Sequence, residues 1–261
     1  MAEDLEAVFA SANRGDESAV IVLLRAARSG DATAMFLMGR LRDVQREPHA
    51  ARTDLVEARA WYERAASTGC TQAQFALGNM YEFGEGTPND DVLARHWYER
   101  AAIAGDAEAQ MSYARMLQTG RGGGKSDADA ATWYRKATHQ GHDLAATNLA
   151  LMHYRKEIAD ASDGVAFTLF GLAGDKLDGI AHLMLANMWI EGRGTEMDAA
   201  HALLHLCIAS LLLPEGSDRA RVIDQTNLIF DEYPALRAKF ESAAADYVRE
   251  RSAAGSAASP R

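Results

Sequence analysis

The chain has 261 residues, enough for one large domain or two ordinary ones. Hydrophobic residues make up 48% and charged residues 25%, which is typical of a folded globular protein and excludes a largely disordered chain. Alanine is the most frequent residue and there are only 5 prolines, which favours packed helices over a sandwich or barrel of short strands. The net charge of −10 argues against nucleic acid or an anionic membrane as the partner of the whole surface.

The sequence also indicates the cellular compartment in which the protein is expected. The opening segment, MAEDLEAVFA, is acidic and lacks the basic and apolar regions of a signal peptide. The longest mostly apolar run, residues 199–213, ends before Pro214 and is shorter than the ~20 residues of a membrane span, so it predicts a buried helix. Two cysteines, Cys70 and Cys207, favour reduced thiols over a disulfide framework. We therefore expect a cytoplasmic protein with no membrane insertion.

The first predicted element is a short helix over residues 3–13, which belongs to an N-terminal cap at residues 1–17. A region of repeats is predicted to follow it over residues 18–213.

Trp-Tyr pairs begin at positions 61, 97 and 133, which are 36 residues apart. A glycine follows each pair, at 69, 105 and 141, and pairs of loop glycines keep the same register at 84 and 86, 120 and 122, and 192 and 194. This agreement indicates internal repeats, so the chain is expected to be one continuous stack.

Each repeat predicts two helices joined by a tight turn. The first helix carries an apolar stripe formed by Ala58, Trp61, Tyr62, Ala65 and Ala66, and the second carries one formed by Ala73, Ala76, Leu77, Met80 and Tyr81. Gly69 supplies the left-handed residue that ends the first helix, and Thr71 with Gln74 resembles a capping box for the second. Because one such pair has no core of its own, each pair must be covered by the next, which predicts a solenoid.

The phrase A-x-x-W-Y-x-x-A-A-x-x-G, followed by A-x-x-x-L-G-x-M-Y-x-x-G-x-G, resembles the Sel-one-like repeat, a relative of the tetratricopeptide repeat. The unit that begins at Ala58 matches almost throughout. Three departures stand out: Lys156 and Ile158 replace the loop glycines of the fourth unit, Leu177 replaces the turn glycine of the fifth, and the first unit needs about three extra residues around Pro48. The resemblance implies an all-α, right-handed α/α solenoid of five to six helix-turn-helix repeats with helical caps.

The C-terminal region predicts the second cap. Residues 217–230 and 234–251 are expected to form two capping helices within a region at residues 214–251, the second with an apolar face that includes Leu236, Phe240 and Tyr247. Residues 252–261 lack periodicity and bulky apolar side chains, so we expect a disordered tail there.

Two candidate sites for small ligands have simpler explanations. The segment 120–126, GRGGGKS, ends like a phosphate-binding loop, but Thr119 stands where that motif needs its first glycine, and the segment follows a helix. We interpret it as the loop between two repeats. His201 and His205 lie one turn apart, near Asp198, yet zinc usually requires three or four converging ligands, so a packed helix face is the better interpretation.

The remaining reactive residues predict no chemistry. His139 and His142 flank the turn at Gly141 and are expected to be solvated. Cys70 stands at the start of a helix, where a thiolate is stabilised, but no base is expected within reach. Cys207 is expected in the core. The sequence predicts no catalytic group, metal or cofactor site, so we expect a protein that is not an enzyme.

The repeat does predict a surface. Arg64, Arg100 and Lys136 occupy the same position of successive first helices and are expected to form a basic column, with His96 and Thr132 near it. In the Sel-one-like family the first helices generally line the concave side, so the resemblance implies that this column faces a partner's acidic or carboxyl-bearing segment. The alternative is a solvated helix face with weak pairs such as Arg59 with Glu63.

The function that we expect from these features is a non-catalytic scaffold or adaptor that binds a protein or peptide in its concave groove. Sel-one-like proteins serve as adaptors in multi-protein assemblies, and the resemblance carries this expectation. Two alternatives stay open: an immunity protein that neutralises a bacterial toxin, and a hydrolase of cell-wall compounds or β-lactams. The paired cysteines of the relatives for which hydrolysis is claimed are missing here.

Overall fold

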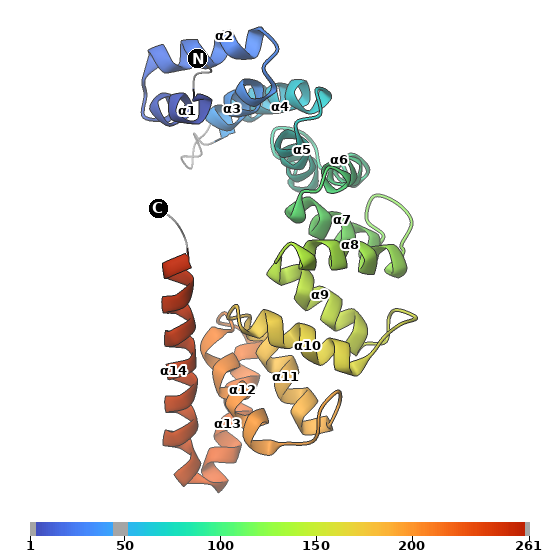
Figure 1. Cartoon of the computed structure of the whole chain (residues 1–261), viewed down its shortest axis with the longest axis vertical. Helices are drawn as coiled ribbons and strands as arrows, with labels where there is room; N and C mark the ends of the chain where they lie inside the picture. Colours follow the sequence, from blue (N-terminus) through green and yellow to red (C-terminus); the bar gives the residue numbers. More distant parts are fainter. Residues whose placement is uncertain (1–3, 44–51, 259–261) are drawn as a thin grey trace. The chain divides into compact units, whose positions relative to one another are not determined.

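The computed structural model describes residues 4–43 and 52–258, and these residues form fourteen α-helices without any strand (Figure 1). They fall into two compact units, Met1–Trp133 and Tyr134–Arg261, and each unit is described by itself. The expected all-α fold is confirmed. The extra residues expected around Pro48 lie outside the described residues.

Unit 1 consists of successive antiparallel helices, the last of which crosses into unit 2. They are α1 (Leu5–Asn13), α2 (Glu17–Arg28), α3 (Ala32–Asp43), α4 (Arg52–Ser67), α5 (Thr71–Phe83), α6 (Asp91–Ile103), α7 (Ala107–Thr119) and α8 (Asp127–His139). Each of α3 to α6 packs against the next along the chain, as expected for stacked helix pairs. The predicted N-terminal helix is present as α1.

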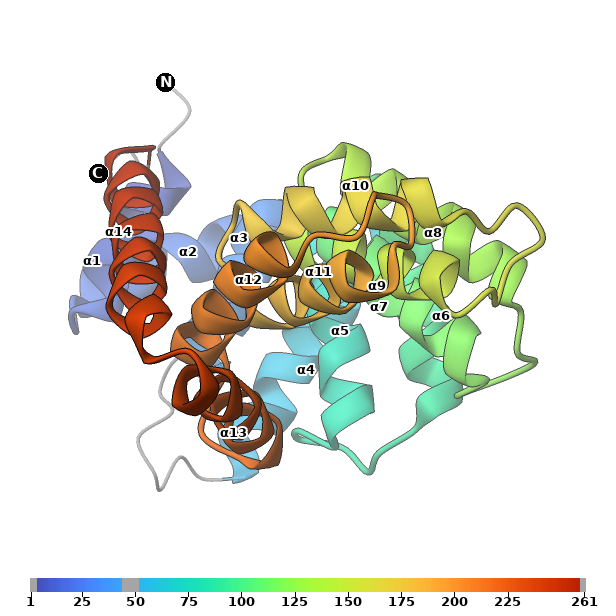
Figure 2. The same ribbon diagram turned by 90° about the horizontal axis from the view of Figure 1, so that it is seen from below.

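Unit 2 continues the pattern and ends in two further helices. Its helices are α9 (Asp143–Tyr154), α10 (Asp163–Gly174), α11 (Gly179–Glu191), α12 (Ala199–Leu212), α13 (Ser217–Glu232) and α14 (Pro234–Ala258). Figure 2 shows α13 and α14 beside α12, and their apolar side chains share a core that includes Cys207, Phe230 and Phe240. The expected burial of Cys207 is confirmed, and α13 and α14 match the predicted capping helices.

The repeats interlock through a tyrosine that packs on a glycine. The rings of Tyr62 and Tyr98, on first helices, are buried against the second helix of the preceding repeat. A Cβ atom added to Gly39 or to Gly78 would lie 2.5 Å from the ring that covers it. The absence of a side chain at these two glycines therefore allows neighbouring helices to approach, as the abundance of small residues in the sequence suggests.

Two positions that depart from the repeat pattern keep its backbone geometry. Lys156 and Leu177 have φ angles of 58° and 65°, and among the described residues they are the only ones other than glycine with positive φ. Lys156 replaces a loop glycine, and Leu177 replaces a turn glycine. The fold therefore imposes the left-handed conformation at both positions, although residues with a Cβ atom, such as lysine and leucine, disfavour it.

The capping box predicted at Thr71 is wrong. The residue before α5 is Cys70, whose side chain makes no capping hydrogen bond. Gln74 instead donates from Nε2 to the main-chain carbonyl of Ala66 over 3.4 Å. Gln110 makes the same bond to Ala102 over 3.2 Å, so this glutamine ties the two helices of a repeat together rather than capping one of them.

Helix α14 extends further than the sequence indicates. It continues to Ala258, whereas a disordered segment was expected from residue 252. Residues 252–258 are mostly alanine and serine, and no proline interrupts the chain before position 260. Alanine is the strongest helix former, which explains how a helix persists there without an apolar face.

Candidate partner-binding face

The first helices of unit 1 expose arginines at equivalent positions. Arg64 in α4 and Arg100 in α6 are both exposed, and each guanidinium lies over the ring of the tryptophan three residues earlier. The distance from the guanidinium carbon to the ring centroid is 4.5 Å for Trp61 and 5.4 Å for Trp97. Both distances fall within the range of a cation–π interaction. Each of these repeats therefore presents a half-buried aromatic ring with a cation on it.

The tyrosine that follows each tryptophan explains this orientation. Tyr62 and Tyr98 point into the repeat interface and are buried, which fixes the rotation of the helix about its axis. The preceding tryptophan then lies at the edge of the buried stripe and is partly exposed, and residues three positions further on face solvent.

Arg64 and Arg100 differ from several other arginines that the structure describes, because they have no acidic partner among the described residues. Within the described residues no carboxylate forms an ion pair with either of them. By contrast, Arg59 pairs with Glu63 over 2.5 Å, which confirms the pair expected from the sequence. Arg135 pairs with Asp160 over 2.6 Å. The two exposed guanidiniums thus keep their donors available.

The other predicted site residues are also exposed. His96 lies edge-on to Trp97, with ring centroids 5.3 Å apart. Thr132 donates its hydroxyl hydrogen to the carbonyl of Ala128 over 3.0 Å, one turn earlier in α8. Lys136 is exposed on α8, in the part of that helix that belongs to unit 2. A column that joins all three cations stays a prediction.

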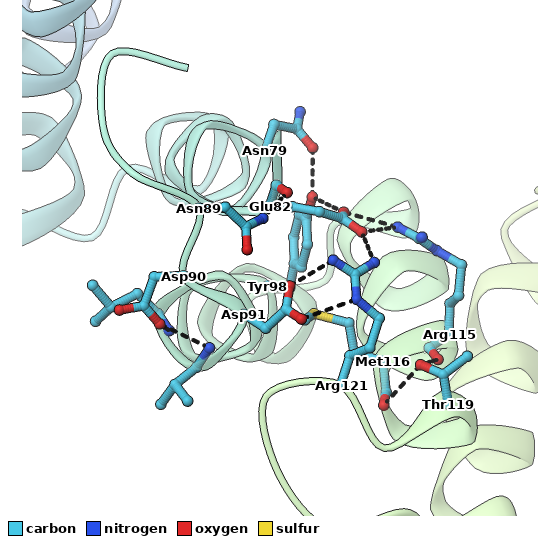
Figure 3. A network of polar contacts seen from close by, with 12 residues as sticks. Asn79, Glu82, Asn89, Asp90, Asp91, Tyr98, Arg115, Met116, Thr119 and Arg121 are labelled. Atoms are coloured by element: carbon cyan, nitrogen blue, oxygen red, sulfur yellow. Dashed lines mark hydrogen bonds and ion pairs between the residues drawn. The ribbon is translucent and has the colours of Figure 1, made fainter. Parts of the chain in front are cut away.

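Sequence reasoning missed a network of charges inside unit 1. Glu82, at the end of α5, is buried, yet its carboxylate accepts hydrogen bonds from Tyr98, Arg115 and Arg121 (Figure 3). The Tyr98 hydroxyl lies 2.8 Å from Oε2, and the two arginines approach to 2.8 and 2.6 Å. The residues come from α5, α6, α7 and the following loop, so the network links adjacent repeats.

The network controls protonation within it. Burial alone would raise the pKa of Glu82, but the hydrogen bonds from Tyr98, Arg115 and Arg121, with the positive charge of Arg115, lower that pKa below its usual value. Burial and the nearby Glu82 carboxylate raise the pKa of Tyr98. A charged Glu82 and a neutral Tyr98 are therefore the forms that the fold stabilises, which indicates a structural role.

Arg121 also belongs to a clamp that recurs in unit 2. Its guanidinium binds Asp91, the first residue of α6, over 2.5 Å. Arg193, at the equivalent position of a later loop, binds Asp163, the first residue of α10, over 2.9 Å. Lys156 reaches the same carboxylate over 2.7 Å. Arg121 and Arg193 thus attach their loops to the start of the preceding first helix.

The loop at residues 120–126 has the structural role expected from the sequence. It joins α7 to α8, and Gly120 ends α7 in the left-handed conformation. Arg95 donates to the carbonyl of Gly124 over 3.0 Å, and Lys125 pairs with Asp127 over 3.1 Å. These contacts therefore attach the loop to α6 through Arg95 and to the start of α8 through Asp127.

The histidines of the predicted pair in α12 point to different partners. His201 Nδ1 lies 2.8 Å from Asp198, whereas His205 Nδ1 lies 2.8 Å from Nδ1 of His182 in α11. Among the described residues, no group of three or more His, Cys, Asp or Glu side chains is arranged to hold a metal ion. The packed position expected for His205 is confirmed, and its ring stacks on that of His182.

The histidine pair has a defined tautomer. His182 Nε2 lies 3.1 Å from the carbonyl of Gly174, which only accepts, so this nitrogen carries the hydrogen. Nδ1 of neutral His182 is then an acceptor, and His205 donates to it. Burial lowers the pKa of both histidines to about 4. His182 thus makes the same backward bond as Gln74 and Gln110, which precede it by whole repeats.

The remaining reactive residues have local roles. His142 was expected to be solvated, but its Nδ1 accepts a hydrogen bond from the amide of Ala145 and caps α9. Cys70 is partly buried, with Sγ 3.5 Å from the side-chain oxygen of Gln72. Burial raises the pKa of Cys207 to about 11, which makes its thiol a poor nucleophile at neutral pH.

The stacked helix pairs place the chain in the class of α-solenoid repeat proteins. A family model described as the Sel1 repeat matches residues 32–70, 71–106 and 107–142. Residues 32–142 therefore consist of three Sel1 repeats. Among the helices that the structure describes, none combines the length and the apolar character needed to cross a bilayer.

Solved structures support this assignment. A Sel1 repeat protein from Oxalobacter formigenes is 29% identical, with a TM-score of 0.70 over 78% of this chain and 82% of that one. A protective antigen of uropathogenic Escherichia coli, which displays the same fold, is 24% identical with a TM-score of 0.71, over 91% of this chain and 49% of that one. This chain spans about half the length of that antigen, and the likeness to it concerns the fold. No curated protein matches the sequence.

Proposed function

We propose that this protein is a non-catalytic scaffold that binds an acidic or carboxyl-bearing segment of a partner protein on the exposed face of its first helices. The observation that carries the proposal is the recurrence of an unpaired guanidinium stacked on a tryptophan, at Arg64 on Trp61 and at Arg100 on Trp97. We also propose that it acts in the cytosol, in line with its two free cysteines.

The chemistry of these two positions suits recognition of carboxylates. Arginine presents several donors in a planar fork that matches a carboxylate, and stacking on an aromatic ring leaves these donors free while it limits side-chain motion. Arginine and tryptophan are also enriched among the residues that dominate binding energy at protein interfaces. A segment with acidic residues next to apolar ones would use both the guanidinium and the exposed part of the ring.

The repeat extends this face beyond the two arginines. His96 adds a further donor beside Trp97, and Thr132 and Lys136 occupy the corresponding positions of α8. Within unit 1 the proposed face comprises Arg64, His96, Arg100 and Thr132; Lys136 holds the equivalent sequence position in the part of α8 that belongs to unit 2. Because the surface as a whole is acidic, with a net charge of −10, this basic stretch provides orientation as well as affinity.

A selection from random peptides displayed on phage tests the proposal without knowledge of the native partner. We expect enrichment of peptides rich in Asp and Glu, or ending in a free carboxylate, and at least about tenfold weaker binding to the double variant Arg64→Glu/Arg100→Glu. The control is Arg221→Glu/Arg249→Glu, which makes the same change of charge at two exposed arginines of α13 and α14. Peptides without acidic character, or equal binding to both double variants, would refute it.

The two alternative functions receive no separate support. Within the described residues, no feature favours neutralisation of a toxin over binding of another protein. A hydrolase would need a nucleophile and a base, but the thiol of Cys70 contacts Gln72 and the ring of His205 pairs with His182. We therefore propose the scaffold role alone.

A further inference from the structure

Unit 2 contains an apolar cavity where unit 1 has its charged network. Ile190 in α11 and Leu206 in α12 stand at the repeat positions of Glu82 and Tyr98, three repeats later. In unit 1 the carboxylate and the hydroxyl of that pair bond to each other over 2.8 Å. Neither Ile190 nor Leu206 carries a polar group. At this position of the last repeat, Ile190 and Leu206 therefore form an apolar surface in place of the hydrogen bond between Glu82 and Tyr98.

The cavity has the size of a small-molecule site. Its volume is about 600 Å³, and it lies between α11 and α12 on one side and the capping helices α13 and α14 on the other. Ile229, Leu236 and Phe240 complete its lining. Ligand pockets of ~300–1,000 Å³ with mostly apolar walls are typical of sites that enclose most of a small ligand. Ile190 remains 54% exposed within it, so apolar surface is left for a ligand to cover.

A single cation stands at this cavity. Lys239 is the only charged residue that lines it, and its ammonium group lies 5.5 Å from the ring centroid of Phe240. Within the part of the chain that the structure describes, no carboxylate forms an ion pair with Lys239. Lys239 and Phe240 also line a smaller adjoining pocket that includes His201, whose Nδ1 is held by Asp198.

We infer that this cavity is a binding site for an amphiphilic anion, a fatty acid whose aliphatic chain lies against Ile190, Leu206 and Phe240 and whose carboxylate pairs with Lys239. Apolar walls favour the aliphatic chain, since burial of its methylene groups is the main source of affinity. The exposed ammonium group selects an anionic head over a neutral or cationic one. The site belongs to unit 2, whereas Arg64 and Arg100 belong to unit 1, and the inference goes beyond the proposed scaffold function.

Calorimetric titration with three probes that share a ten-carbon chain tests the site. Decanoate, decanol and decyltrimethylammonium are each added to the full chain below the concentration at which they form micelles. We expect one decanoate per chain, with decyltrimethylammonium bound at least about fivefold more weakly. The variant Lys239→Glu should reverse this preference, whereas Lys176→Glu, an exposed lysine away from the cavity, should leave it unchanged.

A second variant tests the cavity rather than the charge. Ala200 is an exposed residue in its wall, so Ala200→Trp should fill the space and abolish decanoate binding while circular dichroism shows the native helix content. If Ala200→Trp loses its helices, the inference is tested by Lys239→Glu alone, through the reversed preference between decanoate and decyltrimethylammonium. Absence of saturable decanoate binding, or the same preference in native protein and Lys239→Glu, would overturn the inference.

Discussion

Gly122 lies against the main-chain carbonyl of Asp91 so closely that a Cβ atom on the glycine would be 2.1 Å from that oxygen. Gly194 has the same relationship with Asp163, at 2.4 Å, and Gly86 with Leu55, at 2.6 Å. In these three loops the second glycine therefore packs against the start of the preceding first helix. The arginine clamps at Arg121 and Arg193 reinforce the same contact.

Replacement of Gly122 should be far more costly than replacement of its neighbour. Gly122→Ala combines a clash with the backbone and a φ of 69°, so we expect unfolding free energy to fall by about 2 kcal/mol or more. Gly124→Ala is the matched control, because nothing lies within 4 Å of its Cβ position and its φ is ordinary, and it should change stability by less than about 0.5 kcal/mol. Urea denaturation of both variants measures the difference; equal effects would contradict the proposed contact.

Restoration of a missing glycine should stabilise the protein. Leu177 adopts a φ of 65° at the position of a turn glycine, so Leu177→Gly should raise the unfolding free energy by about 0.5 kcal/mol. Lys176→Gly, one residue earlier and with negative φ, should lower it, because glycine there only adds freedom to the unfolded chain. Thermal melts of the two variants give the comparison. A lower melting temperature for Leu177→Gly would mean that the strain is outweighed by packing of its side chain.

The buried carboxylate of Glu82 should contribute more than any exposed ion pair. Glu82→Gln keeps the shape of the side chain but removes the charge that faces Arg115 and Arg121. We expect the unfolding free energy to fall by about 2 kcal/mol. This is less than the cost for a fully buried ion pair, because both arginines are partly exposed to solvent. Glu241→Gln, in an exposed pair with Arg237, should cost less than about 0.5 kcal/mol.

The effect of Glu82 also has a predicted pH dependence. The pKa of Glu82 is lower in the folded protein than in the unfolded chain. The charged carboxylate therefore stabilises the fold at any pH above the pKa of the unfolded chain, and this stabilisation is lost as the pH falls through the pKa of the folded protein. The unfolding free energies of native protein and Glu82→Gln should therefore begin to converge as pH falls below about 4.5. A difference that stays constant down to pH 3 would show that shape rather than charge is responsible.

The histidine pair should make the stability of unit 2 decline in mild acid. Burial lowers the pKa of His182 and His205 to about 4, so between about pH 6.5 and 4 the unfolded chain binds protons that the folded chain does not. Unfolding free energy should fall by several kcal/mol over this range, at most about 3 kcal/mol for each histidine. Urea midpoints measured at half-unit steps of pH give the slope.

The repeat itself supplies the variant that tests this dependence. His182→Gln places at this position the residue found at Gln74 and Gln110, which keeps a donor for the carbonyl of Gly174 and removes a titrating group. We expect a flatter pH profile. His139→Gln, at an exposed histidine, should keep the native profile. Identical slopes in all three proteins would rule out the pair as the cause.

The sequence predicts the parts of this structure that recur with the 36-residue period. The Trp-Tyr pairs and the loop glycines define the helix pairs, and the departures at Lys156 and Leu177 mark the positions where the backbone is strained. The Arg59 and Glu63 pair, four residues apart on one helix, is likewise predictable from local spacing. Local geometry and periodicity are sufficient for these features.

Features that depend on side chains from different repeats are not predictable in this way. Glu82 reads as an exposed acidic residue, and only the fold brings Tyr98, Arg115 and Arg121 to it. A signal was present in the arginine between two loop glycines, which recurs at positions 121 and 193. The exposure of Arg64 and Arg100 follows from the period, but their stacking on tryptophan requires the structure.

The scaffold proposal is tested most directly by capture of the native partner from the source cell. Tagged protein retains the partner, as identified by mass spectrometry, and the same experiment is run with Arg64→Glu/Arg100→Glu and with the charge-matched control Arg221→Glu/Arg249→Glu. We predict that the native chain and the control retain the partner, whereas the first variant loses it with unchanged helix content. Equal retention by both double variants would contradict the role of this face.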